Sequence, residues 1–457
     1  MSRQIPVRTA RTRAKMPLLK KLFWLYFLLL IFEGALRKWI MPQFSGPLLL
    51  VRDPVALLII IEAFRTNKWP ERWSVVTGIL ACAFLGLCAL QVILGDNSWI
   101  AAVYGLRSYL LPFPVAFVMG ENLTVEDLRK FGICTLWLLL PLTALEVAQY
   151  LAAPSSFLNA GAYEGAGQIA YVPGHVRASA TFSFVAGPIS YAPMAAAFVF
   201  YGLIKEKFAK KSWLLWAATA ALLLSIPVVG SRTLVFQLAG VVACAGIAAM
   251  FGASQLFKAL KIVAPVLALS FLVSLLPVFS AASVSMQERF QNANAAEGGT
   301  AGRVVMHRAV SPILEQLEIF DYTSHPIGVG MGQGASAITK LRTGSAGFSL
   351  SEGELGRAMN ELGPFPGVGF MLFRLILALS LFKWALVEAR NQEPLALFLV
   401  PLAANGIFFS VLEQPTEQGF MVIGIAFLLA ALKLGKHERA PAPSQQVRRL
   451  PMRYSVR

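Results

Sequence analysis

Residues 212–229 read SWLLWAATAALLLSIPVV, a run of apolar and small side chains without a charged residue. A bilayer core about 30 Å thick needs about 20 apolar residues in a helix, because every backbone amide must be hydrogen-bonded inside the hydrocarbon. The run is long enough and apolar enough to meet this requirement. It therefore predicts a transmembrane helix.

Similar runs recur along the whole chain. The predicted spans lie at approximately 17–35, 46–64, 73–94, 99–119, 131–151, 183–204, 212–229, 233–251, 262–281, 366–388, 394–411 and 416–433. The composition agrees, since 56% of the residues are hydrophobic and only 14% are charged, which is unlike a soluble globular protein. We expect an all-α polytopic membrane protein with about twelve transmembrane helices.

Charge predicts how these helices are oriented. Residues 1–21 carry seven Lys or Arg and no acid, and residues 432–457 carry seven against one acid. Basic connections at 65–72, 205–211, 258–261 and 383–390 fall on the same side as these tails, which the positive-inside rule makes cytoplasmic. We therefore expect both termini in the cytoplasm. The high pI reflects topology and anionic lipid and argues against nucleic-acid binding.

The spans and loops divide the chain into five parts. They are a basic tail at 1–16, nine spans within 17–281, a large external loop with short amphipathic helices at 282–365, three spans within 366–433, and a basic disordered tail at 434–457. The four cysteines lie within spans, so a disulfide framework is not expected. No Cys or His pair has the spacing of metal ligands, and we expect no metal and no cofactor.

Charged residues inside or just beside the first spans are candidate substrate ligands. Arg37 and Lys38 follow the first span, Arg52 and Asp53 lie in the second, and Arg107 lies in the fourth. Charges in a membrane are costly and usually face a protein interior or a wet cavity. Two structural alternatives remain open: Arg37 and Lys38 could extend to the interface, and Arg52 could pair with Asp53.

Arg107 lies far from either end of its span, which argues against an interfacial position. Glu146 in the fifth span could pair with it or line a polar cavity. Arg374 in the tenth span is a further charge at membrane depth.

More cations lie in the outer connections. Arg177 precedes the sixth span, Arg232 begins the eighth, and Arg303 and His307 lie four residues apart on an amphipathic segment of the long loop. A guanidinium binds two phosphate oxygens at once, so several arginines on one side of the membrane predict a site for an anionic headgroup.

The rest of the long loop contains a glycine-rich stretch and a short helix. Residues 325–334, HPIGVGMGQG, lack the strand, helix and Lys of a nucleotide loop, so we expect tight turns. Ser351 and Glu354 have the spacing of a capping box. On the helix that follows, Arg357 and Glu361 are spaced for an ion pair.

Several segments together resemble the O-antigen ligase and Wzy-type polysaccharide polymerase superfamily. They are Arg177-Ala178-Ser179-Ala180-Thr181-Phe182 before a span, Ser231-Arg232, Gly302-Arg303 before an amphipathic helix, His325-Pro326-Ile327-Gly328-Val329-Gly330, and Glu361-Leu362-Gly363. Their order, and the position of one long external loop ahead of the last three spans, match the superfamily as well. The resemblance covers approximately residues 170–370.

The resemblance implies a helical glycosyltransferase fold of the GT-C kind in the bacterial inner membrane. It implies a metal-independent, inverting transfer on the periplasmic side, with sugars donated from undecaprenyl pyrophosphate. Arg177, Arg232 and Arg303 would hold the pyrophosphate and stabilise charge that develops on it, with Arg232 and Arg303 expected among the catalytic residues. His307 and Arg357 are further expected substrate ligands.

The chain departs from the ligase pattern at Glu352, where ligases carry a His. A carboxylate can also act as the base, so Glu352 is the expected base. The departure favours a polymerase of exopolysaccharide, capsule or O-antigen repeat units over ligase-type transfer to another acceptor. A lipid-linked oligosaccharide flippase and a non-enzymatic assembly subunit remain alternatives. The expected partners are the lipid-linked oligosaccharide, membrane lipid, and a flippase and chain-length regulator of the same pathway.

Overall fold

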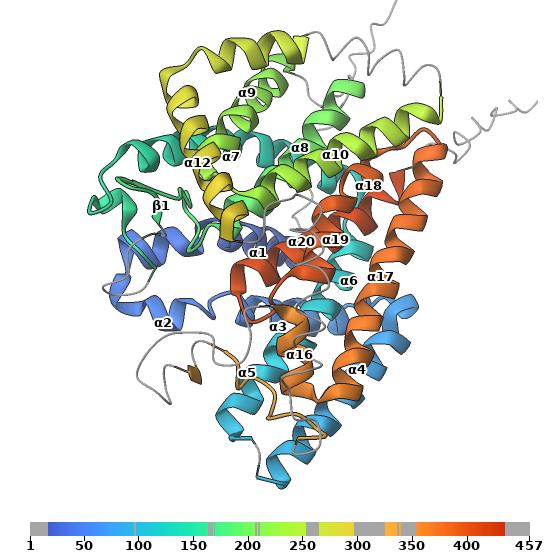
Figure 1. Ribbon diagram of the computed structural model, residues 1–457. Helices are drawn as coiled ribbons and strands as arrows, with labels where there is room; N and C mark the ends of the chain where they lie inside the picture. Colours follow the sequence, from blue (N-terminus) through green and yellow to red (C-terminus); the bar gives the residue numbers. More distant parts are fainter. Residues whose placement is uncertain are drawn as a thin grey trace, which may run out of the picture.

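A computed structural model gives the architecture of most of the chain. It describes residues 17–95, 97–162, 168, 170–205, 208, 211–252, 265–296, 325–335, 338–339 and 353–434. Within these residues the protein is a bundle of helices with one small β-hairpin (Figure 1).

The main helices, in chain order, are α1 (Leu18–Ala35), α3 (Asp53–Arg65), α4 (Glu71–Ile93), α5 (Trp99–Leu110), α6 (Pro112–Asn122), α7 (Val125–Leu151), α8 (Ala186–Ile204), α9 (Ser212–Val229), α10 (Arg232–Met250), α12 (Pro277–Ala296), α16 (Glu354–Leu362), α17 (Pro364–Arg390), α18 (Leu395–Phe398), α19 (Val400–Phe409) and α20 (Pro415–Ala431). Short helical turns are η1 (Leu36–Ile40), η2 (Pro42–Phe44), α2 (Ser45–Leu48) and η3 (Phe157–Asn159). Strands β1 (Ala170–Val172) and β2 (His175–Val176) pair antiparallel.

Polar side chains fix where several helices begin. Thr124 and Asp127 form a capping box at the start of α7, which satisfies amides that have no partner within the helix. Ser98 caps α5 by accepting from the amide of Ala101. Gly230 ends α9 in the left-handed conformation, with φ at 57°.

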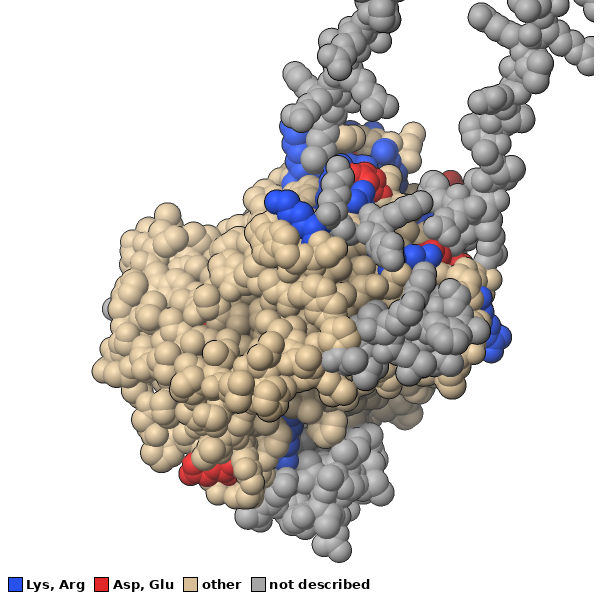
Figure 2. Space-filling model, turned by 90° about the horizontal axis from the view of Figure 1, so that it is seen from above, with Lys and Arg blue, Asp and Glu red and all other residues tan. Residues whose placement is uncertain are grey.

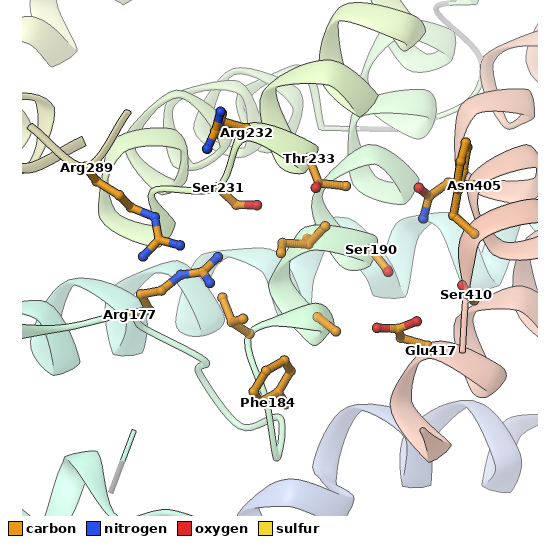
Figure 3. Close-up of a pocket in the computed structure, with 14 residues that line it drawn as sticks. Arg177, Phe184, Ser190, Ser231, Arg232, Thr233, Arg289, Asn405, Ser410 and Glu417 are labelled. Carbon is orange, nitrogen blue, oxygen red and sulfur yellow. The ribbon is translucent and has the colours of Figure 1, made fainter. Parts of the chain in front are cut away.

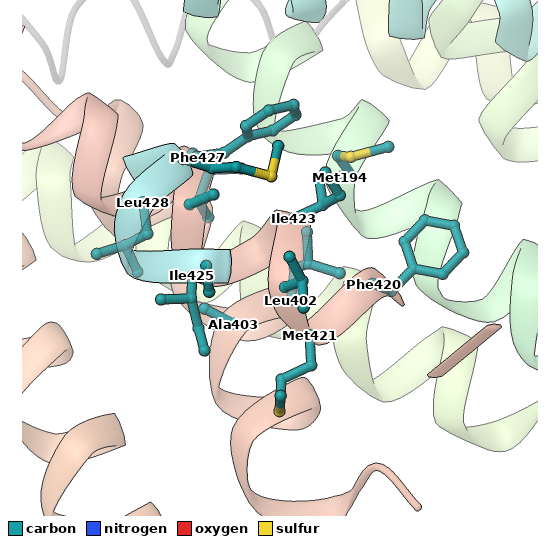
Figure 4. Packing of buried hydrophobic residues seen from close by; sticks show 14 of the residues in the cluster. Met194, Leu402, Ala403, Phe420, Met421, Ile423, Ile425, Phe427 and Leu428 are labelled. Atoms are coloured by element: carbon teal, nitrogen blue, oxygen red, sulfur yellow. The ribbon is translucent and has the colours of Figure 1, made fainter. Parts of the chain in front are cut away.

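Helix α20 forms the centre of the bundle. Nearly all of its residues from Thr416 to Ala431 are buried, and it packs against α6, α8 and α19. Figure 4 shows Phe420 and Met421 of α20 among side chains of α8 and α19. A helix that is apolar on every side can be buried in this way, and α20 is enclosed by other helices of the bundle.

The outer helices carry the membrane-compatible surface. Among the described residues, the helices long and apolar enough to cross a membrane are eight, or nine if one bent pair is a single span. They are Pro42–Arg65, Glu71–Ile93, Trp99–Asn122, Val125–Leu151, Ala186–Ile204, Ser212–Val229, Arg232–Met250 and Pro364–Arg390. The face seen in Figure 2 is a broad uncharged area, with charged residues gathered toward two opposite edges. These features indicate a helical membrane protein.

The predicted count of twelve spans is not confirmed. The first predicted span forms α1, which carries Lys20, Lys21 and Glu33. The ninth forms the pair Pro265–Ser274 and Pro277–Asn292, bent by 87°. The eleventh and twelfth form the shorter helices α19 and α20, and each starts at a proline-containing first turn.

The long loop predicted at 282–365 is described in part. Its first residues continue α12 as far as Ala296, and its last helix is α16. The amphipathic helix expected around Arg303 and His307 lies outside the described residues. On which side of the membrane the loop lies stays a prediction.

Two smaller predictions in this loop have clear outcomes. The glycine-rich stretch forms turns, as predicted, with positive φ at Gly328, Gly330 and Gly332. The predicted capping box is wrong, because the N-cap of α16 is Gly353 and its first residue is Glu354. The Glu354 carboxylate binds arginines of the buried interior instead of a backbone amide at the helix start.

Candidate functional site

Three arginines face one cavity of about 430 Å³ between α8, α10, α12, α19 and α20. They are Arg177, Arg232 and Arg289, and Figure 3 shows all three on one side of the cavity. Glu417 lies on the opposite side, close to Ser190. The cavity therefore has a cationic end and an acidic end.

Arg177 lies in a loop whose backbone and side chains are hydrogen-bonded by Gln149 and Lys38. Arg177 directly follows β2. The backbone amides of Ser179 and Ala180, two and three residues later, donate to Gln149 Oε1 at 3.0 and 2.8 Å. The Lys38 ammonium donates to the Ser179 hydroxyl at 2.5 Å and to the Ala180 carbonyl at 3.1 Å. These bonds fix the backbone from which Arg177 enters the cavity.

Arg232 is placed by the sharp turn between α9 and α10. Gly230 lies against the Tyr171 ring, and a Cβ at this glycine would overlap it. The Tyr171 hydroxyl donates to the Pro227 carbonyl at 2.7 Å, which ties the hairpin to the end of α9. Arg232 is the first residue of α10, and its guanidinium lies 5.8 Å from the centre of the Phe290 ring.

Arg289 comes from α12, and its guanidinium lies 6.0 Å from the centre of the Tyr171 ring. Burial, together with the charge of Arg289, lowers the pKa of Arg177 to about 10. Among the described residues, the buried Nε of Arg177 has no hydrogen-bond partner. A second cation nearby and an unsatisfied donor both favour a bound anion, because an anion would compensate the charge and accept the hydrogen bond.

A second, apolar cavity of about 690 Å³ adjoins the first. The two share lining residues Arg232, Thr233, Asn405 and Phe409. The remaining lining of the second cavity is mostly aliphatic and aromatic. It consists of Phe236, Gln237, Leu375, Ala378, Leu379, Phe382, Val400, Pro401, Ala404 and Phe408. A cavity lined by arginines and an apolar cavity thus meet at the start of α10.

Of the predicted site residues that the structure describes, Arg177 and Arg232 line this cavity together. Arg303, His307 and Glu352 lie outside the described residues, so their roles stay predictions. Five other predicted substrate ligands, Arg37, Lys38, Arg52, Arg107 and Arg357, do not line this cavity. All five contact other parts of the protein instead.

Four of these five belong to the region around α1 and α3. Arg52 pairs with Glu33 at 2.9 Å, and Arg107 pairs with Asp53. The suggested pair between Arg52 and Asp53 is therefore wrong, because each finds a partner from a distant segment.

The interfacial alternative for Arg37 and Lys38 is also wrong, since both side chains are buried. Arg37 donates to the Ser183 hydroxyl at 2.9 Å and lies 3.5 Å from Glu33, while Lys38 binds the loop of Arg177. Both therefore hold the loop that carries Arg177. The substrate role predicted for them stays untested.

The proposed pairing of Glu146 with Arg107 is wrong as well. The Glu146 carboxylate accepts a hydrogen bond from the Ser225 hydroxyl of α9 at 2.6 Å, and Arg107 is held by Asp53. These two charges belong to different parts of the bundle.

Arg357 lies in a separate buried network. It pairs with Glu354 at 2.7 Å, with Glu361 at 3.1 Å and with Glu413 at 3.0 Å. The predicted pair with Glu361 is confirmed, but it is buried within the protein and shared with two further carboxylates. Arg374 contributes a second cation by pairing with Glu354. Three carboxylates therefore surround two guanidiniums.

This network is connected to the cavity through the backbone between α19 and α20. The amide of Leu412 donates to Glu354 at 3.1 Å, and Arg374 donates to the Ser410 carbonyl at 2.9 Å. Ser410 itself lines the cavity. The network thus holds one wall of the site in place.

Sequence reasoning missed Arg289 and Glu417 as members of the site. Arg289 stands in the sequence as an ordinary charge at the start of the loop, and Glu417 as an acid in a first helical turn. Neither has a motif that would have singled it out. Among the described residues, no group of three or more Cys, His, Asp or Glu is arranged to hold a metal.

Comparisons with known proteins add no identity: no protein-family model matches the chain, and no curated protein matches it.

Proposed function

We propose that this protein polymerises oligosaccharide repeat units carried on undecaprenyl pyrophosphate, giving an exopolysaccharide, capsule or O-antigen. One observation carries the proposal: the arginine cavity and the apolar cavity share a wall. A polyprenyl pyrophosphate is an anion joined to a long hydrocarbon, so its two parts match the two cavities. A nucleotide sugar has no such hydrocarbon.

In the proposed complex, Arg177, Arg232 and Arg289 bind the pyrophosphate oxygens. The first isoprene units enter the apolar cavity between α10, α17 and α19. The sugar linked to the pyrophosphate occupies the rest of the arginine cavity, whose lining residues Ser190 and Asn405 offer polar groups to its hydroxyls. Remote contacts of this kind position the reacting carbon for attack.

The proposed reaction is a metal-independent inverting transfer. A hydroxyl of one repeat unit attacks the anomeric carbon of another, and undecaprenyl pyrophosphate leaves. Arginines aimed at the leaving pyrophosphate stabilise the charge that develops on it. The proposal places the cavity on the periplasmic side of a bacterial inner membrane, with both termini in the cytoplasm, and a flippase and a chain-length regulator as partners.

The test uses purified protein in vesicles with the lipid-linked oligosaccharide of its host, without metal or nucleotide sugar. We expect a polymer ladder. Arg177→Ala and Arg232→Ala should each reduce its rate by about 100-fold to 1000-fold, the range for losing one group that stabilises transition-state charge. Arg65→Ala is the control, because Arg65 is an exposed arginine paired only with Glu62 of the same helix.

Other products would identify the alternatives. Transfer of a single oligosaccharide to a different acceptor, without a ladder, would favour the ligase-type reaction. Donor that crosses the bilayer without growing would favour a flippase. A ladder with unchanged rate in both arginine variants would contradict the role given to the cavity.

A further inference from the structure

A carboxylate lies in the same cavity as the three arginines. Glu417, in the first turn of α20, lines the cavity opposite Arg177 (Figure 3). Within the described residues Glu417 forms no ion pair within 4 Å, and Arg374, the cation that acts on its charge, is itself paired with Glu354. Arginines bind substrate anions, whereas an unpaired carboxylate at the other end of a cavity is suited to a different task.

The position of Glu417 is fixed by the segment between α19 and α20. The Val411 amide donates to one Glu417 carboxylate oxygen at 2.7 Å. The next residue, Leu412, donates its amide to Glu354 in the buried network, as described above. One oxygen of Glu417 is therefore anchored to backbone that the network holds, and the carboxylate is directed toward the cavity (Figure 3).

An inverting transfer needs a base on the side of the sugar that faces away from the leaving group. The leaving pyrophosphate belongs at the cationic end, with Arg177, Arg232 and Arg289. The attacking hydroxyl then approaches from the opposite end of the cavity, which is where Glu417 lies. Ser190, Asn405 and Ser410 line the same cavity near Glu417, away from Arg177 (Figure 3).

Resting on the function proposed above, we infer that Glu417 is the general base of the transfer. Its carboxylate takes the proton from the acceptor hydroxyl, whose oxygen forms the new bond to the anomeric carbon. The bond from that carbon to the pyrophosphate oxygen breaks, and its electron pair leaves with the pyrophosphate beside the arginines. No metal or further reactant is needed for the balance. This assigns to a carboxylate of α20 the role that the sequence assigned to Glu352.

A structural reading of Glu417 makes a different prediction. An acid in a first helical turn interacts favourably with the helix dipole, and neutralising it would weaken the fold slightly without selectively slowing the chemistry. Glu71 is the matched case, because it also follows a proline in the first turn of a helix but is exposed. Glu71→Gln therefore serves as the control for helix-start effects.

The experiment measures polymer rate and donor binding in the same vesicles for wild type, Glu417→Gln, Glu417→Asp, Glu352→Gln and Glu71→Gln. Loss of a general base typically lowers the rate by about 100-fold to 10,000-fold. We expect that loss in Glu417→Gln with unchanged donor affinity, partial recovery in Glu417→Asp, and wild-type behaviour in Glu71→Gln.

Three results would overturn the inference. They are a wild-type rate in Glu417→Gln, a parallel loss of donor binding and rate in that variant, or a loss confined to Glu352→Gln. If the wild-type protein itself makes no polymer, the proposed function fails and the inference falls with it. An inactive wild type would thus reject the proposed function, whereas an active wild type with an unaffected Glu417→Gln variant would reject only the role of Glu417.

Discussion

Replacing Gly406 by alanine tests how closely α19 must approach α20 to form the site. Gly406 is buried on α19, next to Asn405 of the cavity wall. A Cβ at this position would lie 2.9 Å from Met421 Cα and 3.1 Å from Met421 Cβ. Carbon atoms pack best at about 3.5–4.0 Å, so the helices would have to separate by roughly 0.6–1 Å. Small residues let helices pack this closely in membrane proteins.

The expected cost follows from this overlap. Inserting a methyl group into a packed core costs about 1–3 kcal/mol, and the contact with backbone, which cannot rotate away, places Gly406→Ala in the upper part of that range. The control is Gly369→Ala on α17, where a Cβ meets no atom within 4 Å. There alanine should stabilise the helix by up to about 1 kcal/mol.

The assay is thermal unfolding of both variants in lipid nanodiscs, followed by tryptophan fluorescence, together with binding of the lipid-linked donor. We expect Gly406→Ala to unfold at a lower temperature than wild type and to bind donor more weakly, because Asn405 and Phe409 move with α19. Equal unfolding temperatures for Gly406→Ala and Gly369→Ala would refute this account of the packing.

Three further predictions follow from other parts of the molecule. Burial, together with the charge of Arg37, lowers the pKa of Lys38 from 10.5 to about 7. Between these two values the unfolded chain binds a proton at Lys38 that the folded protein does not bind. The free energy of unfolding of wild type therefore increases as pH rises from about 7 toward 10. Measured over this range, the unfolding temperature of wild type should rise relative to that of Lys38→Met. A constant difference between the two proteins would argue against this titration of Lys38. Arg357→Ala leaves three buried carboxylates short of a cation and should cost about 3–5 kcal/mol, as read from its unfolding temperature; a loss below about 1 kcal/mol would mean that the network is not formed. Ala378→Trp narrows the apolar cavity and should weaken donor binding without lowering the unfolding temperature, whereas unchanged affinity would place the lipid chain elsewhere.

Local patterns allowed part of this structure to be predicted. Long apolar runs such as 212–229 predict helices, because each backbone amide in hydrocarbon must be hydrogen-bonded and a helix does this within its own segment. The pair between Arg357 and Glu361 follows from helical spacing alone. Arg177 and Arg232 were predicted as site residues from their position in outer connections next to spans and from the family resemblance, and both line the cavity.

The remaining features depend on contacts between distant segments. Arg52 and Asp53 are neighbours in sequence, yet Glu33 and Arg107 are their partners, and no spacing rule relates these four residues. Glu417 resembles any acid at a helix start until α19 and α20 place it opposite the arginines. Pairings of this kind are set by how helices pack, which a single sequence does not specify.

The central claim is that the arginine cavity binds a lipid-linked pyrophosphate. The most direct measurement is the binding of undecaprenyl pyrophosphate, compared with undecaprenol, to wild type and to the double variant Arg177→Ala and Arg232→Ala by native mass spectrometry in nanodiscs. We predict that wild type prefers the pyrophosphate and that the double variant loses this preference while still binding undecaprenol. Equal binding of both lipids by wild type, or an unchanged preference in the double variant, would contradict the account.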